Sequence, residues 1–304
     1  MPCGFSKKLI SALVCQKDGA ILNVNQITKE NELSIFDGQL VCATCHSKYE
    51  IKNGIANLLN NQNNPEQLMQ DEIIARDQEA NKYDQRLSVR YYKEIPSTLK
   101  MTGDCNSKKI IEYGCGTGRL TVDLVQKSKQ VLAIDFSLDS LRLLADKCVD
   151  RDNIGLVLAD AVQFKSVDNF FDLAVSFQFL EHIPTTEQRK EWLNNVHKTL
   201  VNNGKLISTV YHQDLRRRIK KQDQEGRHSS GVFFHYFFAK EIRREFKKYF
   251  DTIDIHPIDI TLPLESRLKI PSKLAGLLSR LSEHMPIVNQ LGHLLIIKAK
   301  KNNE

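Results

Sequence analysis

The sequence predicts a doubly wound α/β protein built on a mostly parallel sheet. Short apolar segments alternate with helical segments from about residue 108 to 210, which is typical of a parallel sheet with helices on both faces. A glycine-rich turn follows the first apolar segment, and an acidic residue ends the second. The 304 residues are 41% hydrophobic and 26% charged, so the chain can bury a sizeable core.

Residues 1–60 are predicted to form a small β segment around cysteines. Lys7 and Lys8 precede the apolar stretch 9–14 and then Cys15, an order that resembles a lipoprotein signal. Because this stretch is shorter than the roughly 7 to 15 residues of a signal core, we expect a buried strand leading into Cys15. Seven irregularly spaced cysteines favour a reducing, cytoplasmic location over a disulfide framework. No apolar run approaches the roughly 18 to 20 residues that span a bilayer.

Residues 61–100 are predicted to be a linker followed by helices. The segment opens with Asn-Gln-Asn-Asn-Pro, which has a linker composition. Ile73 and Ile74 mark a first helix, and Tyr91 and Tyr92 mark a second one. The second helix is expected to end before Pro96, because proline lacks the N–H group that a helix interior needs. The remaining residues, 101–304, form the main domain.

The main domain is expected to contain strands at 110–111, 131–134, 154–158, 171–176 and 206–210. Helices are expected at 138–149 and 187–200, the latter closed by a turn at Asn202-Asn203-Gly204. Beyond 210 the sequence predicts a basic stretch, an aromatic cluster at 233–238, a helix near 239–249, a strand at 252–259, a proline-punctuated insertion at 263–286 and a last strand at 294–299.

The strongest motif is Glu-Tyr-Gly-Cys-Gly-Thr-Gly, which runs from Glu112 to Gly118 between a strand and a helix. Gly114 and Gly116 allow a tight turn and the close approach of a ligand. The following helix presents free N–H groups and a positive dipole end, which suit an anionic group. A lone Gly-x-Gly pattern is weak evidence, and its position in a strand–turn–helix unit is what strengthens it.

Acidic residues follow the second and third strands. Asp135 lies 23 residues after Glu112, where it is placed to accept hydrogen bonds from a ribose. This feature serves a nicotinamide cofactor equally well, but Arg119 occupies the third-glycine position of a dinucleotide fingerprint. Asp160 and Ala161 follow the third strand and are placed to meet an adenine. A fourth run, 171–184, leads from a buried strand into a loop at the sheet edge where such folds bind ligands.

These motifs, in this order, resemble the class I S-adenosylmethionine (SAM) dependent methyltransferases, in the branch that includes quinone-biosynthesis enzymes. The resemblance covers roughly residues 80–215 and implies a seven-stranded sheet with a closing hairpin. It implies SAM as cofactor, with the following assignments. Glu112, Gly114, Gly116 and Gly118 hold the methionine end, Asp135 the ribose, Phe136, Asp160 and Ala161 the adenine, and Phe177 lies in the same site.

Methyl transfer from a sulfonium needs mainly alignment of the acceptor, and an oxygen or nitrogen acceptor also needs a base. His182, in the loop after the fourth strand, is the candidate for that base. Tyr211, His212, His228 and His235 are weaker candidates for the base. The alternative is that Glu181 and His182 only shape the loop.

The N-terminal segment resembles the zinc ribbon of the tRNA-methyltransferase-activator type. Cys42 and Cys45 form a Cys-x-x-Cys pair, and Cys15 with Asp18 stands where the matching pair is expected. Zinc sites are normally built from Cys and His, and carboxylates also serve. Cys15, Asp18, Cys42 and Cys45 are therefore the candidate ligands of a zinc ion. Cys3 or His46 is an alternative fourth ligand, and a ribbon without metal is a further alternative.

The leading functional hypothesis is methylation of an O, N or C atom of a small molecule, such as a quinone, polyketide, lipid-linked or sugar intermediate. Residues 211–250 hold eleven Lys and Arg against five Asp and Glu, 11 − 5 = +6, which can attract phosphate, nucleic acid or an anionic membrane. An RNA methyltransferase is therefore the first alternative, and a non-catalytic scaffold the second. The sequence defines neither the acceptor nor the oligomeric state.

Overall fold

The computed structural model describes residues 2–59, 88–261, 265 and 269–301. The predicted linker and the helix at Ile73 lie outside these residues. Seven strands form the central sheet in the order β8-β7-β6-β9-β10-β14-β13. They are β6 (Lys109–Tyr113), β7 (Gln130–Asp135), β8 (Ile154–Leu158), β9 (Phe171–Phe177), β10 (Leu200–Tyr211), β13 (Thr252–Ile260) and β14 (Gly292–Lys300).

The first five of these strands in sheet order are parallel, and β14 is antiparallel to both β10 and β13. The closing pair is therefore a hairpin-like edge on an otherwise parallel sheet, and the predicted doubly wound α/β class is confirmed. The strand order reverses between β6 and β9, and the crevice above such a reversal is where doubly wound folds bind ligands.

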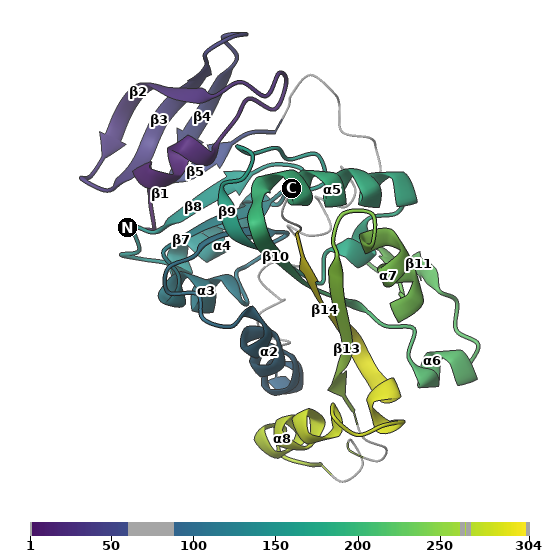
Figure 1. The fold of residues 1–304 in the computed structure, drawn as a ribbon. Coiled ribbons are helices and arrows are strands. Elements are labelled where there is room, and N and C mark those ends of the chain that lie inside the picture. The colour runs from purple at the N-terminus through teal and green to yellow at the C-terminus, as the bar shows by residue number, and fades with distance from the viewer. Residues whose placement is uncertain (1, 60–87, 262–264, 266–268, 302–304) are drawn as a thin grey trace.

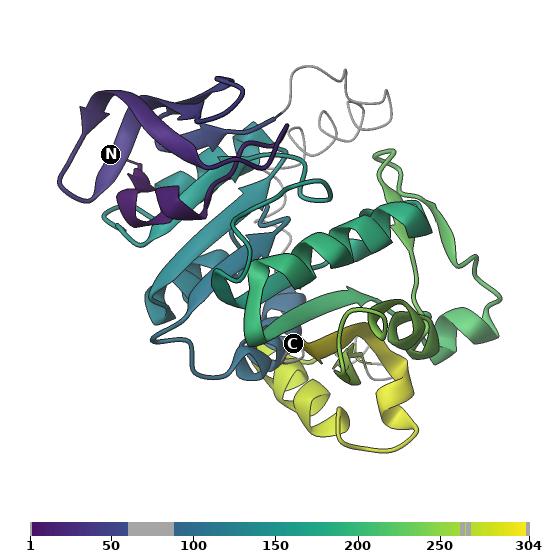
Figure 2. The ribbon, with the colours of Figure 1, turned by 45° about the horizontal axis from the view of Figure 1, so that its top comes forward.

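The N-terminal segment extends this sheet. Antiparallel strands β1 (Phe5–Ser6), β2 (Leu22–Glu30), β3 (Ser34–Cys42), β4 (Lys48–Lys52) and β5 (Ile55–Asn57) precede the central sheet. β5 then pairs in parallel with β8, so that Ile55 lies opposite Leu156 and one 12-stranded sheet results. Figures 1 and 2 show these strands beyond the β8 edge, away from the C-terminal helices.

One N-terminal prediction is wrong. Residues 9–14 were expected to be a strand, but Lys7–Ala12 forms a 3₁₀ helix, η1. Leu9 and Ala12 are buried while Ser11 is exposed, and this spacing of three matches a helical turn rather than strand alternation. Strand-like bridging begins only at Leu13 and Val14.

Two layers of helices cover the sheet. α2 (Ser88–Thr102), α3 (Thr121–Lys127) and α4 (Leu138–Lys147) share one core with β-strand side chains. α5 (Thr186–Thr199), α7 (Ala239–Phe246) and η1 share the other. In the second core the fully buried Trp192 packs edge-on against Tyr113 and tilted against Phe179, which fixes α5 beneath the carboxyl ends of β6 and β9.

The helix predicted to end before Pro96 instead continues through it, to Thr102. Pro96 has no N–H to donate to the carbonyl of Tyr92, four residues earlier. That carbonyl accepts a hydrogen bond of 2.8 Å from Arg280 Nη1. A side chain distant in sequence therefore replaces the missing helical bond.

The turn predicted to cap the helix at 187–200 is also wrong. α5 ends at Thr199, and Leu200 is already extended. β10 begins there, with an irregular stretch before Lys205 in which Asn203 has a positive φ of 63°. The Asn-Asn-Gly sequence therefore shapes a strand irregularity instead of a helix terminus.

The remaining elements surround the carboxyl edge of the sheet. They are η3 (Leu180–His182), α6 (Leu215–Ile219), β11 (Glu225–Arg227), β12 (Phe233–His235), α8 (Ser272–Ser282) and η4 (Val288–Leu291). Among the residues that the structure describes, no helix is long and apolar enough to cross a membrane.

Candidate functional site

The glycine turn after β6 has one side that is packed and one that is open. A Cβ on Gly114 would lie 2.6 Å from Phe179 Cδ2, and a Cβ on Gly118 would lie 2.3 Å from Leu144 Cδ1. A Cβ on Gly116 would meet nothing within 4 Å, although its φ of 52° is left-handed. The outer glycines therefore serve packing, whereas Gly116 borders space in which a ligand can lie against the backbone.

Glu112 is a buried carboxyl group beneath this turn. It is 2% exposed, and its Oε2 has no hydrogen-bond partner among the described residues. Burial raises the pKa of Glu112 to about 8, because desolvation disfavours the charged form. A buried acceptor without a partner is unfavourable, so this position favours a cationic ligand group that would pair with it.

Asp135 connects β7 to the glycine turn. Its Oδ2 accepts a hydrogen bond of 2.7 Å from the N–H of Gly116, and its Oδ1 accepts one of 2.9 Å from the N–H of Ser137. The carboxylate is thus held at the carboxyl end of β7 with its orientation fixed by both neighbours. Each carboxylate oxygen accepts more than one hydrogen bond, so Asp135 retains capacity for ligand hydroxyls.

The other predicted cofactor residues differ in exposure. Phe136 and Asp160 are half-buried, whereas Ala161 and Phe177 are buried in the two cores. Burial raises the pKa of Asp160, whose Oδ1 accepts from the N–H of Val162. Cys115, inside the glycine turn, is also buried, and burial raises the pKa of its thiol well above the ordinary value, which excludes a reactive thiolate at neutral pH.

A polar cluster that sequence reasoning missed joins α2 to this turn. The fully buried Glu94 accepts from Arg119 Nη2 at 3.2 Å and from Gln178 Nε2 at 2.7 Å. Gln178 follows β9 with a positive φ of 54°. Since Glu94 lies 25 residues from Arg119 and 84 from Gln178, no local pattern could reveal the cluster.

Aromatic and imidazole rings gather at the carboxyl ends of β9 and β10. They are His182, Tyr211, His228, Phe234, Tyr236 and His293. The ring of Tyr211 has its centroid 5.8 Å from that of His182 and 6.2 Å from that of His228. His228 is exposed, and Tyr211 and His182 are half-buried, so this ring cluster is reachable from solvent.

A backbone carbonyl determines the tautomer of the neutral His182 ring. Its Nδ1 lies 2.6 Å from the carbonyl oxygen of Phe233. Because a carbonyl only accepts, Nδ1 carries the hydrogen, and in the neutral ring Nε2 is then the acceptor nitrogen. This is the tautomer that a general base on Nε2 requires.

Arg217 closes the ring cluster on the side of β14. It is buried, forms an ion pair with Asp214, and lies with its guanidinium carbon 4.1 Å from the ring centroid of Tyr236. Its Nη2 is 2.9 Å from His293 Nδ1. A fixed positive charge therefore lies beside the rings.

Two of the weaker base candidates lie outside this cluster. His212 Nδ1 is 2.8 Å from the carbonyl oxygen of Gly292, and burial lowers the pKa of His212. His235 lies between Glu225 and Glu241. The structure therefore groups His182 with Tyr211 and His228, and places His212 and His235 elsewhere.

The four predicted metal ligands meet in the N-terminal segment. The ligand atoms of Cys15, Asp18, Cys42 and Cys45 all lie within 4.8 Å of one another. The sulfurs of Cys15 and Cys45 are 3.6 Å apart, and Cys42 Sγ is 3.4 Å from both carboxylate oxygens of Asp18. A tetrahedral zinc ion with Zn–S bonds of about 2.3 Å separates its sulfurs by roughly 3.8 Å, so the arrangement fits such an ion.

The alternative ligands do not join this group. The backbone N–H of Cys3 donates to Ala145 of α4, and His46 is not among the four grouped residues. Asp18 therefore occupies the fourth position by geometry. The N–H of Ala20 donates to Asp18 Oδ1 and lowers the pKa of this carboxyl to about 2, which keeps it ionised.

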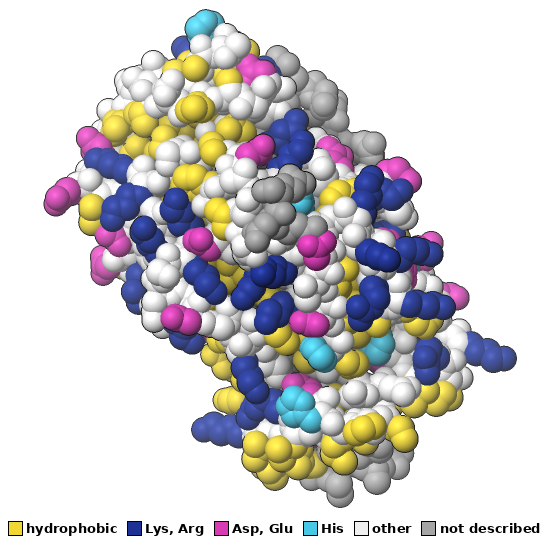
Figure 3. Space-filling view, in the orientation of Figure 1, with side chains coloured by type: hydrophobic (Ala, Val, Ile, Leu, Met, Phe, Trp, Pro, Cys, Tyr) yellow, Lys and Arg dark blue, Asp and Glu magenta, His cyan; other side chains and the backbone are white. Residues whose placement is uncertain are grey.

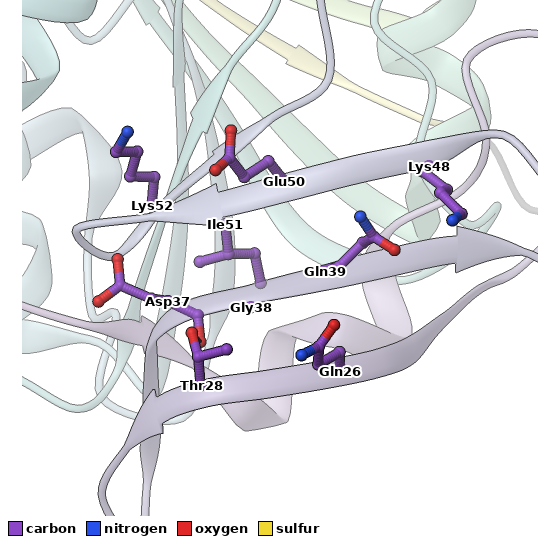
Figure 4. Close-up of a pocket in the computed structure, with 9 residues that line it drawn as sticks. All are labelled: Gln26, Thr28, Asp37, Gly38, Gln39, Lys48, Glu50, Ile51 and Lys52. Carbon is purple, nitrogen blue, oxygen red and sulfur yellow. Dashed lines mark hydrogen bonds between the residues drawn. The ribbon is translucent and has the colours of Figure 1, made fainter.

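A polar groove of about 360 Å³ crosses the exposed face of β2, β3 and β4. Figure 4 shows its side chains on one face of the three strands. They are Gln26, Thr28, Asp37, Gln39, Lys48, Glu50 and Lys52, with Gly38 and Ile51 between them. Because these strands lie beyond the β8 edge of the sheet, the groove is separate from the glycine turn.

Residues 110–204 match the family model described as a methyltransferase domain. An uncharacterized methyltransferase of Staphylococcus carnosus is 25% identical over 190 residues, which are 57% of this chain and 78% of that protein. A demethylmenaquinone methyltransferase of Staphylococcus aureus is 32% identical over 89 residues, or 28% of this chain and 37% of that protein.

Among solved structures, a Burkholderia thailandensis 1,6-didemethyltoxoflavin-N1-methyltransferase, bound to 1,6-didemethyltoxoflavin and S-adenosylhomocysteine, superposes with a TM-score of 0.52. The match covers 82% of this chain and 96% of that chain at 15% identity. At this identity the likeness concerns the fold alone. It agrees with the strand order described above.

Proposed function

We propose that this SAM-dependent methyltransferase transfers its methyl group to a hydroxyl or amine of a small aromatic acceptor held in the ring cluster. The observation that carries the proposal is the position of His182. Its ring lies beside the rings of Tyr211 and His228, with Nδ1 bonded to a carbonyl. The fold places this cluster at the carboxyl ends of β9 and β10, next to the glycine turn at the end of β6.

The donor side supports SAM binding by residues of β6 and β7. SAM carries an ammonium group and a sulfonium, and the buried Glu112, whose Oε2 has no hydrogen-bond partner among the described residues, would ionise to pair with one of these cations. Gly116 offers backbone space for the methionine end, and Asp135 offers acceptor capacity for the ribose hydroxyls. We assign Phe136, Asp160 and Ala161 to the adenine by their place after β7 and β8. Phe177 lies in the core beneath the site.

The acceptor side supports general-base catalysis by His182. SAM supplies an activated methyl group, and its transfer leaves S-adenosylhomocysteine. His182 Nε2 would take the proton of the acceptor hydroxyl as the oxygen attacks, so that the imidazolium formed retains its bond to the Phe233 carbonyl. The rings would stack on a flat acceptor, and the Arg217 charge would favour a developing phenolate. The similar proteins include a demethylmenaquinone methyltransferase and a 1,6-didemethyltoxoflavin-N1-methyltransferase, so acceptors of these two kinds belong in the test panel.

Titration calorimetry with SAM, followed by methyl transfer to a panel of hydroquinones and phenols, tests the proposal. Asp135→Ala should weaken SAM binding, whereas Asp139→Ala, a change at an exposed carboxylate on α4, should leave it unchanged. Turnover of a phenolic acceptor that depends on His182 is the expected result. Turnover only of RNA, with phenols inert, would overturn the acceptor class.

The basic stretch offers less to an RNA substrate than its sequence implies. Arg217, the central residue of the Arg216–Arg218 run, is buried and forms an ion pair with Asp214. Its charge is therefore used within the protein and is not presented to RNA. The exposed cations of this stretch remain, and salt-dependent RNA binding is the measurement that distinguishes the two acceptor classes.

We also propose that Cys15, Asp18, Cys42 and Cys45 bind a structural zinc ion. The S···S and S···O separations given above support it, and three cysteines with one carboxylate supply the four ligands of a tetrahedral ion. A closed four-ligand site is structural rather than catalytic. Zinc thiolate ligands are consistent with a reducing cytoplasm, and all seven cysteines are free thiols in the structure.

A further inference from the structure

Helix α8 presents a row of leucines to solvent. Leu274, Leu277 and Leu281 are 47%, 47% and 60% exposed. Their spacing of three and four places them on one face of the helix. The opposite face, with Ala275, Gly276 and Ser279, is buried. The leucines therefore lie on the side that faces away from the protein core.

The apolar surface continues beyond the helix. Met285 and Ile287, in the turn after α8, are 50% and 72% exposed, and Ile219 at the end of α6 is 72% exposed. α6 lies against η4, which follows Ile287. Figure 3 shows hydrophobic side chains gathered at this lower end of the molecule, over α8 and the turn that follows it. We call the six residues the apolar face: Ile219, Leu274, Leu277, Leu281, Met285 and Ile287.

Cations border the apolar face. The two segments that carry it, 215–221 and 269–287, expose Arg218, Lys220, Lys221, Lys269 and Lys273. The one carboxylate in these two segments, Glu283, accepts from Ser97 Oγ at 2.9 Å and is half-buried. The surface therefore combines large apolar side chains with positive charge that no exposed carboxylate of the same segments offsets.

We infer that the apolar face docks on the surface of an anionic lipid bilayer. An amphipathic surface of leucine, isoleucine and methionine with lysine and arginine at its border is the pattern that enters the headgroup region of a membrane. The positive border selects bilayers with negative surface charge. Exposed cations stand next to the apolar residues in both segments, with Arg218 and Lys220 beside Ile219 and Lys273 beside Leu274, and this charge favours an anionic lipid surface over an uncharged protein partner.

The packing of α8 connects this surface to the glycine turn. α8 rests on α2, where Gly276 allows close approach to the Tyr92 carbonyl and Arg280 donates to it. Glu94, two residues after Tyr92 in α2, accepts a hydrogen bond from Arg119 beside the glycine turn. One helix layer thus separates the docking surface from the catalytic side. A membrane-associated protein would meet apolar acceptors at the bilayer surface.

Co-sedimentation with phosphatidylcholine vesicles, with and without phosphatidylglycerol, tests the inference without any turnover. The protein should bind the vesicles that contain phosphatidylglycerol, and added salt should weaken the binding. Changing Leu277 and Leu281 together to Ser should weaken it by about tenfold or more, since each leucine loses an apolar contact with lipid. The matched control changes Ile21 and Val149, two exposed apolar residues elsewhere, to Ser and should bind as the wild type does.

A fluorescent variant gives an independent readout. Trp192, the one tryptophan of the chain, is fully buried, so the added fluorophore of a Leu281→Trp variant reports on this face. Its emission should shift to the blue with phosphatidylglycerol vesicles, whereas that of Ile21→Trp should not. Unchanged SAM binding by every variant shows that each is folded.

Three outcomes overturn the inference. Equal binding to neutral vesicles would show that the cations play no part. No vesicle binding by the wild type would remove the membrane altogether. A dimer that dissociates in the Leu277 and Leu281 variants would assign the face to a second copy of the chain. Each of these results leaves the proposed methyl transfer to small acceptors unaffected.

Discussion

At the scale of single residues, the buried Glu112 predicts a pH dependence of stability. Its folded-state pKa of about 8 lies above the ordinary value of 4.5, so between these values the folded protein holds a proton that the unfolded chain has released. The free energy of unfolding of the ligand-free protein should therefore fall as the pH rises through this window. Thermal unfolding of wild type and Glu112→Gln measures it, and the variant should show the weaker fall.

SAM binding should lower the raised pKa of Glu112, because a cationic ligand favours the ionised carboxylate. Calorimetry in buffers with different ionisation enthalpies should show the release of roughly one proton at neutral pH in the wild type. Glu112→Gln should release fewer protons. Equal proton release by both proteins would show that Glu112 does not meet the ligand cation.

His182 gives a second prediction. His182→Ala should lower kcat by about a hundredfold or more, the usual contribution of a positioned base, while the Kd of SAM stays the same. His256→Ala, at an exposed histidine on β13, is the matched control, and a similar loss in both variants would argue against a base role.

The cofactor residues that the sequence predicts belong to motifs whose members lie close together along the chain. Glu112, Gly116 and Asp135 belong to short motifs with fixed spacing, and the structure groups them around one turn. The Glu94 cluster and the contact between Arg217 and His293 were not predictable, because their members are 25 to 84 positions apart. Only the three-dimensional path of the chain brings such residues together.

At the scale of elements, one hydrogen bond from α8 replaces the helical bond that Pro96 removes from α2. Arg280→Ala should leave the Tyr92 carbonyl without its donor and cost about 1–3 kcal/mol of unfolding free energy. Pro96→Ala should restore a backbone N–H to that carbonyl. In urea unfolding, the double variant should therefore lose less than the single Arg280→Ala variant, and strictly additive losses would contradict this account.

The proposed zinc site predicts that the stability of the N-terminal strands depends on metal. Removal of zinc with a chelator should lower the Tm, since zinc binding contributes to folding free energy. Asp18→Ala should lower the zinc content measured by elemental analysis, whereas Asp18→Cys should retain one ion per chain. Zinc-free wild-type protein with an unchanged Tm would favour a ribbon held by its apolar core alone.

The elements that the sequence predicted best are the buried strands. Their continuous apolar composition is a local signal, and 131–134 and 154–158 both lie within strands of the structure. The failures at η1, at Pro96 and at the end of α5 have different causes. At Pro96 a distant side chain replaces the missing helical bond, as the hydrogen bond from Arg280 to Tyr92 shows. At η1 the burial of Leu9 and Ala12 follows a spacing of three, and at the end of α5 the chain enters β10 directly at Leu200.

At the scale of the whole molecule, the resemblance to class I methyltransferases implied seven strands, and the structure has them in the central sheet. The extension by the N-terminal segment was not predicted. Ile55 and Ala56 carry the same apolar character whether they close a separate small domain or pair with another strand. They pair with Leu156 and Val157, about a hundred positions away. The hydrophobic pattern of the sequence does not indicate which strand will be the partner.

The join between β5 and β8 has a consequence for any shortened form of the protein. All five residues of β8 are buried, and without β5 the strand would offer a row of unpaired N–H and C=O groups on a flat apolar edge. Such edges recruit strands from other molecules. A chain that starts after residue 58 should therefore associate into particles visible by light scattering, even if its glycine turn is intact, and a monodisperse solution would refute this. We therefore expect the N-terminal strands to protect the protein from aggregation by covering the β8 edge.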